Sequence, residues 1–535
     1  MRGLPCGWLN TKHLILAAAA ADGAAAMGST ASTLPPATAD DCIPPKKRGN
    51  WHDAQQPESS IPPKKRRTWQ DVQQPVQNLD WISAMPDDVL IKILSLMTIR
   101  EAATTDCLSS KWRHLWENVP YLRLTASALG MQVLAPNYHD NLDFWNSEAT
   151  KFVHKVNELL LHHSGNGVQK FKVRFPLTSA HASDLDRWVA FAAASGAKSF
   201  ELSLCHRHND MVTVQHVEPY NFPLNYFADV GHCNLHQLWL SNCSLEMVNS
   251  NLNGFSYLDC LVLDSVSVVD AVVLNIMSNC CALNMLGLRK CHQLINVRVY
   301  HAQLLRMDVY DCKSLISINI HAEKLKYFSY MGHKVDVEYE YAPVIQRLHA
   351  HFIKKNECPL ECIGAFPELR TLILQFPSRL QVRRVLQNSK KFSGLKEIVL
   401  YILTSWEKSI HSVVYLLKAA PLVETFSLEA YGTLNPLNKL KIKWPKECTL
   451  GMLHTIRIGG FSGEPELMLL LFFLLKRSPL LKNLLIDPHQ RHYQGFDRWK
   501  AAKPADDATR CFYARGVAWT HLAPKIPSTV KFRVM

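Results

Sequence analysis

Two histidines and two cysteines fall within fourteen residues: His349, His351, Cys358 and Cys362. Imidazole nitrogens and thiolates are the ligands of structural zinc, so these side chains could hold a tetrahedral metal ion. Their spacing differs from that of the familiar zinc fingers, and a zinc site demands four ligands in a fixed geometry. We therefore favour surface histidines and buried thiols at these positions, and we predict neither a metal nor a cofactor.

Sequence motifs of enzyme chemistry are missing from the chain. It contains no G-x-S-x-G nucleophile turn, no G-x-x-x-x-G-K-(S/T) phosphate loop, no G-x-G-x-x-G turn and no H-E-x-x-H metal pair. Each of these motifs places a reactive group or a phosphate at a strand-to-helix turn or on one helix face. The sequence thus favours a protein that binds other molecules over one that catalyses a reaction.

Residues 81–116 contain three short amphipathic helical patterns. The first pattern has the apolar spacing of one helix face: Val89, Leu90, Ile93, Leu94 and Met97. The last pattern carries two tryptophans one helical turn apart, Trp112 and Trp116. Thirty-six residues are too few to bury a core alone. The pattern predicts a module that docks onto another surface, with a helical hairpin in the core of a larger domain as the alternative.

This segment resembles an F-box, whose pattern runs approximately I-S-x-L-P-D-x-(L/V)-L-x-x-I-L-S-x-L and then L-S-x-x-W-R-x-L-W. Ile82, Ser83 and Pro86 begin the match, and Met85 and Asp106 depart from the pattern. The resemblance implies that the module binds a Skp-type adaptor and, through it, a cullin. It also implies which residues make or directly support that contact: Met85, Pro86, Leu90, Ile93, Leu94, Leu108, Trp112, Leu115 and Trp116.

A leucine pattern recurs farther along the chain. Its first clear copy has the spacing L-x-x-L-x-L-x-x-C-x-L from Leu235 to Leu245, and further copies start at Leu258, Leu283, Leu304 and Leu325. These starts are separated by 23, 25, 21 and 21 residues, and looser copies begin at Leu369, Leu395, Val423, Leu453 and Leu481. The period resembles that of leucine-rich repeats, whose units bury their apolar faces by stacking. An unrelated α/β domain with chance leucine spacing is the alternative.

Cysteines and short strands fit the same interpretation. Cys243, Cys291 and Cys312 occupy the position where such repeats keep an inward-pointing asparagine or cysteine, so we expect structural thiols. Residues 168–175 and 200–204 alternate as strands do. Residues 453–486, with an apolar helix at 468–475, resemble the end domain (FBD) of plant F-box proteins with leucine-rich repeats.

The predicted fold class is therefore mixed: a small helical F-box, then an α/β-type leucine-rich-repeat solenoid, after a disordered N-terminal extension. We expect an extension at 1–78, an F-box-like module at 79–124 and a linking helix within 125–165. The repeat array follows at 166–450, and an FBD-like part at 451–535 continues the repeats. A chain of 535 residues has room for these domains.

The first forty residues are rich in alanine, with a short apolar stretch at 14–21. A secretory or organellar signal is one interpretation. We favour a disordered extension, with Met27 as an alternative start. No apolar run reaches the roughly 20 residues of a membrane span, so we expect no membrane contact, and the fifteen dispersed cysteines suggest a reducing compartment.

A duplicated segment carries two basic clusters. IPPKKRGNWHDAQQP (43–57) recurs as IPPKKRRTWQDVQQP (61–75), in a composition typical of unfolded chain. The clusters consist of Lys46, Lys47, Arg48, Lys64, Lys65, Arg66 and Arg67. They favour a nuclear-localisation signal, with a nonspecific nucleic-acid contact or a solvated charge run as alternatives. Nuclear location that survives alanine at both clusters would contradict the import hypothesis.

The resemblances together imply a non-catalytic substrate-receptor subunit of a Skp–cullin–F-box (SCF) ubiquitin ligase of a plant. With the basic clusters, we expect it in the nucleus, the cytoplasm or both. The module would bind the adaptor, and the repeats would hold an unknown target protein for degradation. A non-ligase repeat scaffold is the first alternative. A nuclear nucleic-acid-binding protein that uses the basic segment is the second, and we expect it less.

Overall fold

The computed structural model describes residues 81–132, 142–204, 218–228, 234–246, 252–341, 344–352, 366–376, 392–402, 406–430, 444, 448–493, 499–501 and 508–535. The chain divides into two units, Met1–Trp116 and Glu117–Met535. Among the described residues, no helix is both long enough and apolar enough to cross a bilayer.

The described part of the first unit is a small helical module. It contains α2 (Asp87–Leu94), α3 (Ile99–Thr104) and the 3₁₀ turn η1 (Thr105–Cys107). Pro86 stands at the N-cap of α2, and two aspartates follow in the first turn, where the helix dipole favours negative charge. Helix α3 begins with a capping box, in which Thr98 and Glu101 satisfy each other's backbone N–H groups.

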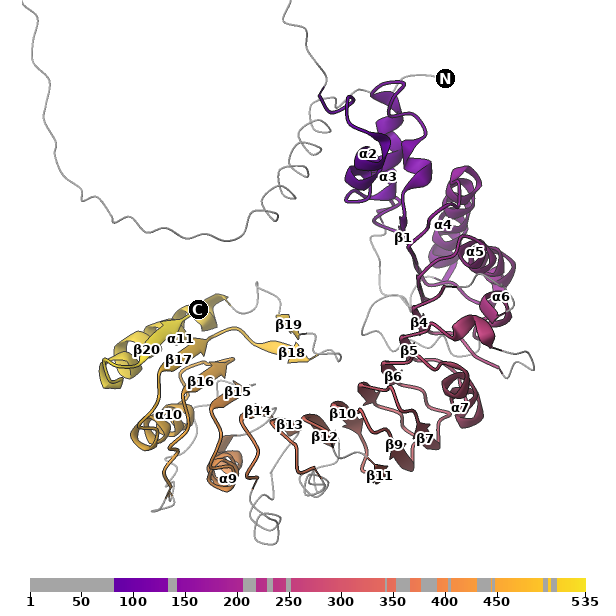
Figure 1. Cartoon of the computed structure of the whole chain (residues 1–535). Helices are drawn as coiled ribbons and strands as arrows, with labels where there is room; N and C mark the ends of the chain where they lie inside the picture. Colours follow the sequence, from indigo (N-terminus) through magenta and orange to yellow (C-terminus); the bar gives the residue numbers. More distant parts are fainter. Residues whose placement is uncertain are drawn as a thin grey trace, which may run out of the picture. The chain divides into compact units, whose positions relative to one another are not determined.

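The second unit is built on one long parallel sheet of fifteen described strands. In spatial order they are β1 (Tyr121–Thr125), β2 (Lys170–Arg174), β3 (Ser199–Ser203), β4 (Gln237–Ser241), β5 (Cys260–Asp264), β6 (Met285–Arg289), β8 (Arg306–Tyr310), β10 (Tyr327–Gly332), β12 (Arg347–Phe352), β13 (Thr371–Phe376), β14 (Glu397–Ile402), β15 (Thr425–Ala430), β16 (Thr455–Gly459), β17 (Asn483–Asp487) and β20 (Lys531–Val534). Figure 1 shows these strands following one another in a row.

The register of this sheet stacks the repeats on one another. Leu238 of β4 pairs with Leu261 of β5, which pairs with Leu286 of β6, and the same column continues into Met307 of β8. These second-position side chains are fully buried, as are the fourth-position ones, because a strand turns alternate residues to the same face. The apolar columns form the core, and the first, third and fifth positions lie on the other face of the sheet, here called the inner face.

The core columns are covered by helices and by a second sheet. The helices are α4 (Leu142–His162), α5 (Ala182–Ala194), α6 (Asn225–Ala228), α7 (Asp270–Asn279), α9 (Trp406–Ala419), α10 (Pro465–Arg477) and α11 (Ala508–Val517). The second sheet has the order β11-β9-β7, from β7 (Asn296–Tyr300), β9 (Ser317–His321) and β11 (Asp336–Tyr341). Figure 1 shows it on the same side of the main sheet as α7 and α9. A short hairpin, β18 (Arg491–Tyr493) and β19 (Trp499–Ala501), completes the described strands.

The edge of the outer sheet is closed by a carboxylate. Asp270, in the first turn of α7, accepts hydrogen bonds from the backbone N–H groups of Ile295 and Asn296, each at 2.9 Å. These N–H groups begin strand β7, which has β9 on its other side. Helix α7 therefore lies next to the outer sheet, and its Asp270 satisfies the N–H groups at the start of β7.

The repeat prediction is confirmed in outline. Strands β4, β5, β6, β8 and β10 each begin two residues after a predicted first leucine, and the later copies correspond to β13–β17. Cys243, Cys291 and Cys312 are buried, free thiols, as expected. Burial raises the pKa of the Cys243 thiol to about 12, so it stays protonated.

The start of the array differs from the predicted one. Strand β1 pairs in register with β2, so the sheet begins at Tyr121, within the predicted 79–124 module and well before residue 166. Residues 142–162 do form a helix, α4, but it connects β1 to β2 as a crossover rather than linking the module to the array. Parallel neighbours require such a crossover. The predicted extension at 1–78 lies outside the described residues.

Candidate functional site

The helical module closes a small core with most of the residues predicted for adaptor binding. Six of the nine are buried: Leu90, Ile93, Leu94, Trp112, Leu115 and Trp116. Met85 and Leu108 are half-buried, and Pro86 is exposed. A buried side chain cannot contact a partner directly unless the module rearranges. These six residues therefore support the shape of the surface, and the other three can reach a partner.

Trp112 connects the end of the module to its beginning. Its indole Nε1 donates a hydrogen bond of 2.9 Å to the hydroxyl of Ser83, 29 residues earlier. The ring itself is almost completely buried. A buried indole N–H needs an acceptor, and Ser83 provides one while fixing the turn that precedes α2. On the surface, Lys111 and Asp87 form an exposed ion pair of 2.5 Å, which contributes little to stability.

Asp106, the departure from the family pattern, has a structural role in the module. One carboxylate oxygen accepts a hydrogen bond from Trp116 Nε1 at 3.1 Å, and the other accepts one from the backbone N–H of His114 at 3.0 Å. His114 has a positive φ of 63°, which costs energy in a non-glycine residue. The carboxylate therefore holds both the second tryptophan and the strained turn before it.

Three large apolar side chains remain exposed on the module. Trp81 is 73% exposed, Leu96 56% and Val89 39%. Val89 lies on α2, whereas Leu96 lies in the turn that follows the helix. Sequence reasoning placed Val89 in the core stripe and assigned no contact to Trp81 or Leu96. The sequence spacing could have shown this exposure, because a helix that turns positions 90, 93, 94 and 97 inward leaves positions 89 and 96 on another side.

The inner face of the second unit carries mixed charge. Its strongest basic concentration is on β1 and β2, with Arg123, Lys170, Lys172 and Arg174. Lys172 forms an ion pair of 2.5 Å with Glu201 on β3. Arg123, Lys170 and Arg174 add further positive charge to the first strands.

A shallow hollow interrupts the inner face at β8, β10 and β12. It is lined by Arg306, Asp308, Tyr327, Phe328, Ser329, Arg347 and His349. Asp308 is buried and binds the Arg306 guanidinium at 2.6 Å, and the Ser329 hydroxyl lies 3.1 Å from His349 Nδ1. In a nucleophilic triad the carboxylate orients the histidine. Here the Asp308 carboxylate binds the Arg306 guanidinium.

The candidate zinc ligands are only partly described. His349 and His351 lie two residues apart on β12, so they share the inner face, and both are buried. Burial lowers the pKa of His351 to about 4, which keeps its imidazole neutral. Cys358 and Cys362 lie outside the described residues. Within the described ranges, no three histidine, cysteine or acidic side chains gather as a metal site would require.

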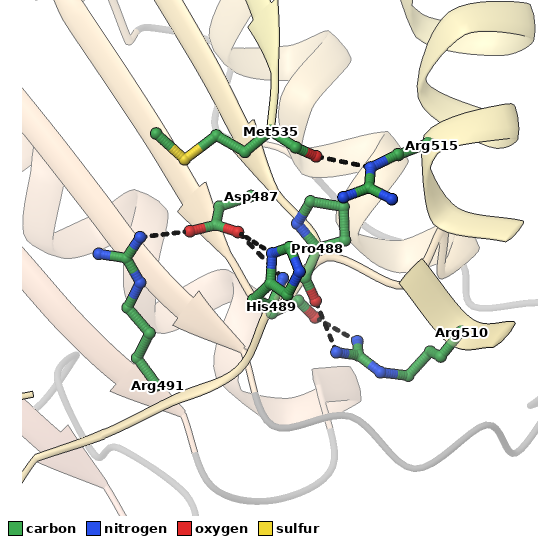
Figure 2. A network of polar contacts seen from close by, with 8 residues as sticks. Asp487, Pro488, His489, Arg491, Arg510, Arg515 and Met535 are labelled. Atoms are coloured by element: carbon green, nitrogen blue, oxygen red, sulfur yellow. Dashed lines mark hydrogen bonds and ion pairs between the residues drawn. The ribbon is translucent and has the colours of Figure 1, made fainter. Parts of the chain in front are cut away.

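A polar network lies where β16 and β17 end (Figure 2). Asp487 is buried, and its carboxylate accepts hydrogen bonds from Arg491 at 2.7 Å and from His489 Nδ1 at 3.0 Å. Arg510 of α11 donates to the backbone oxygens of Gly460 and Pro488, at 3.2 and 2.5 Å. The network connects the outer helix α11 to the turns that follow β16 and β17.

Glu429 lies beside this network with its carboxylate over Gly459, the residue opposite it on β16. A side chain at Gly459 would overlap that carboxylate, so only glycine leaves room for it. The pKa of Glu429 is raised to about 7, chiefly by burial and with a smaller contribution from Asp487, against the lowering effects of Arg491 and Arg457. Near neutral pH, the folded protein therefore binds a proton at Glu429 that the unfolded chain does not bind.

The raised pKa gives a pH dependence that Glu429→Gln should remove. The folded carboxyl holds its proton up to about pH 7 and the unfolded one only to 4.5. The stabilisation that this protonation gives the folded state is therefore fully present below pH 4.5, and it is lost as the pH rises to about 7. At pH 8 we expect the free energy of unfolding of E429Q to exceed that of the wild type by up to about 3 kcal/mol.

Thermal unfolding of both proteins between pH 4.5 and 8 tests this expectation. Glu424→Gln is the matched control, because the exposed Glu424 carboxyl has its pKa lowered by Lys396 rather than raised. Equal pH slopes for the wild type and E429Q would contradict the assignment.

The basic clusters at 46–48 and 64–67 lie outside the described residues, and the import hypothesis for them stays a prediction.

Comparison with known proteins places both units in recognised families. Residues 82–124 match the F-box domain, and residues 159–535 match the family described as At1g61320/AtMIF1, LRR domain. The second match covers most of the second unit and includes the part predicted to be FBD-like. Strand β1 ends at residue 125, so the F-box match reaches into the first strand of the sheet.

The similar curated proteins come from Arabidopsis thaliana. Putative F-box/LRR-repeat protein At3g58880 is 28% identical over 215 residues, or 40% of this chain and 43% of that protein. F-box/FBD/LRR-repeat protein At1g13570 is 27% identical over 216 residues, or 40% and 45%. The chain thus spans less than half of these two relatives. FBD-associated F-box protein At5g56370 is 24% identical over 423 residues, which cover 77% of this chain and 91% of that relative.

Proposed function

This chain belongs to the plant F-box proteins with leucine-rich repeats, and from that premise we propose that it is the substrate receptor of an SCF-type ubiquitin ligase. In this role the helical module binds a Skp-type adaptor, which connects it to a cullin, and the repeats hold a target protein. The chain itself makes and breaks no bonds. Its contribution to ubiquitin transfer is proximity, because a held target lysine meets activated ubiquitin at a raised effective concentration.

The observation that supports this proposal is the exposure of three large apolar side chains on the module, Trp81, Val89 and Leu96. The core beneath them is already closed by Leu90, Leu94 and Trp112, so these residues are not needed inside the module. A surface of this kind is suited to docking onto another protein.

Replacing Val89 and Leu96 by glutamate should weaken adaptor binding by at least about tenfold, because two charges would have to be desolvated at the contact. The fold should survive, since both side chains are exposed. The measurement is the affinity of the purified full chain for a recombinant plant Skp-type adaptor. Helical content measured by circular dichroism checks that the variant is folded.

Leu161→Glu is the matched control for this experiment. Leu161 lies at the end of α4 in the second unit and is 82% exposed, so the substitution makes the same chemical change outside the module. It should leave adaptor affinity unchanged. If the wild-type chain is well folded and yet fails to bind the adaptor, the ligase proposal fails. If the double variant binds as the wild type does, the adaptor contacts another surface.

A further inference from the structure

The last strand of the main sheet has one edge that no described strand covers. Strand β20 pairs with β17 on one side and ends the strand order. Towards β17, the N–H of Lys531 donates to the carbonyl of Lys482, and the N–H of Met535 donates to that of Ile486. Alternate residues of a parallel strand bond to the same neighbour, so the N–H and C=O groups of Phe532 and Val534 face the other way.

The apolar core also stays partly open at this edge. In β17 the inward residues Leu484 and Ile486 are at most 1% exposed. The residues that continue their columns in β20, Phe532 and Val534, are only half-buried. Trp519 packs edge-to-face against Phe532 with ring centroids 5.1 Å apart, but its own side chain is 55% exposed. One more strand would complete the burial of both residues.

The formally charged side chains of the C-terminal segment 508–535 all have the same sign. Residues 508–535 contain the basic residues Arg510, Arg515, Lys525, Lys531 and Arg533 and no aspartate or glutamate. Lys531 and Arg533 are exposed on the inner face of β20. Acidic side chains of an added strand would lie directly opposite them, where opposite charges stabilise a strand pair.

We propose that the outer edge of β20 binds an extended protein segment in which acidic and apolar residues alternate. The segment adds a strand to the sheet by hydrogen bonding to Phe532 and Val534. Its acidic side chains face Lys531 and Arg533, and its apolar side chains cover Phe532 and Val534. This surface lies in the second unit, and it does not depend on adaptor binding.

The charge pattern argues against a second copy of the chain as the occupant. Pairing β20 with itself would set Lys531 and Arg533 against the same basic residues, and like charges in opposed positions destabilise a strand pair. The open backbone groups argue for a polypeptide over a nucleic acid, because an extended peptide offers N–H and C=O groups at the matching spacing.

The test uses the full chain and a fluorescein-labelled peptide of eight residues, alternating glutamate and valine, with binding followed by fluorescence anisotropy. Two versions of the peptide carry backbone N-methyl groups, one on all glutamates and one on all valines. Only one of these two sets of N–H groups faces β20. We expect one methylated peptide to bind at least about tenfold more weakly and the other to bind like the parent. Equal binding by all three peptides would overturn the proposal.

Variants of the chain test the same contact from its other side. Val534→Pro removes an outward N–H while the bonds to β17 remain, which edge strands tolerate, and it should weaken binding about tenfold. Lys531→Glu with Arg533→Glu should abolish binding of the acidic peptide and create binding of a lysine–valine peptide. Lys170→Glu with Arg174→Glu on β2 is the matched charge control and should change nothing.

Three further outcomes would refute the proposal. One is loss of binding in the charge reversal with full binding in V534P, since that result means surface attraction without strand addition. Another is concentration-dependent dimerisation of the free chain that Val534→Pro abolishes, because it would make a second copy the occupant. The third is failure of the parent peptide to bind the folded wild-type chain. The methylated peptides need only the wild-type protein, so the test survives a variant that does not fold.

Discussion

Alanine in place of Gly460 is expected to destabilise the C-terminal part of the repeat array by about 3 kcal/mol. Gly460 follows β16 with a positive φ of 66°, a conformation that side chains other than glycine disfavour. A Cβ there would also overlap the backbone carbonyl oxygen of Ala430, on the neighbouring strand β15. That oxygen cannot turn aside as a side chain could, so the two strands must separate or the turn must change.

The Gly460 turn also holds other parts together. Its N–H donates to the carbonyl of His489 at 3.1 Å, and its own carbonyl accepts from Arg510 at 3.2 Å. A shift of the turn therefore loosens the network of Figure 2 and the contact of α11 with the sheet. We expect faster amide hydrogen exchange in β15–β17 and α11, with little change in β1–β6, because repeats transmit stability mainly to their neighbours.

Hydrogen exchange measured by mass spectrometry on G460A, with urea unfolding alongside it, checks this expectation. Gly516→Ala is the control: Gly516 lies in α11, and apart from its chain neighbours and the adjacent helix backbone no atom lies within 4 Å of the place a Cβ would take. That change should stabilise the helix by about 0.5–1 kcal/mol. If G460A exchanged like the wild type in β15–β17, the strained turn would not have the importance assigned to it.

Trp112→Ala should unfold the helical module and abolish adaptor binding while the repeat array stays folded. Removing a buried tryptophan costs about 3–5 kcal/mol, and so small a core has little more than that to lose. The substitution also leaves the Ser83 hydroxyl without its indole donor. Exchange of residues 81–116 should approach that of an unfolded chain, and protection in β4–β8 should remain.

Two further variants separate packing from surface contact in this experiment. Trp112→Phe keeps most of the ring volume and loses the hydrogen bond to Ser83, so the module should stay folded with about 1 kcal/mol less stability. Trp81→Ala removes a tryptophan that is 73% exposed and should leave exchange unchanged. Unchanged protection of 81–116 in W112A would show that the core does not depend on this residue.

The leucine pattern of the sequence identified the strands that carry it. A leucine, or Val423 in one copy, stands two residues before each of these strands, and this signal located β4, β5, β6, β8, β10 and β13–β17. It failed at β12, where Ile345 stands in place of the first leucine and Ala350 in place of the aliphatic residue two after Leu348. It also failed at β1, because a strand that begins an array has no earlier copy against which its spacing can be compared.

The outer sheet was missed for a different reason. Val297 and Val299 of β7 and Ile318 and Ile320 of β9 alternate as strand residues do, but a repeat template assigns this part of each copy to an irregular return segment. In the module, the pattern gave helices and their apolar residues, but which of those residues are exposed depends on tertiary packing. Asp106 shows the same limit, since its hydrogen-bond partners lie eight and ten residues away.

The sheet of β7, β9 and β11 bears on how a target fits the repeats. A stack bends when its two layers have different thickness per repeat, and helices are about 10 Å wide whereas strands lie about 4.8 Å apart. Where strands form both layers, the two spacings agree and nothing forces the stack to bend. The segment from β6 to β12 should therefore be the straightest and stiffest stretch of the array. A target would meet a flat platform there and more strongly curved surfaces on either side.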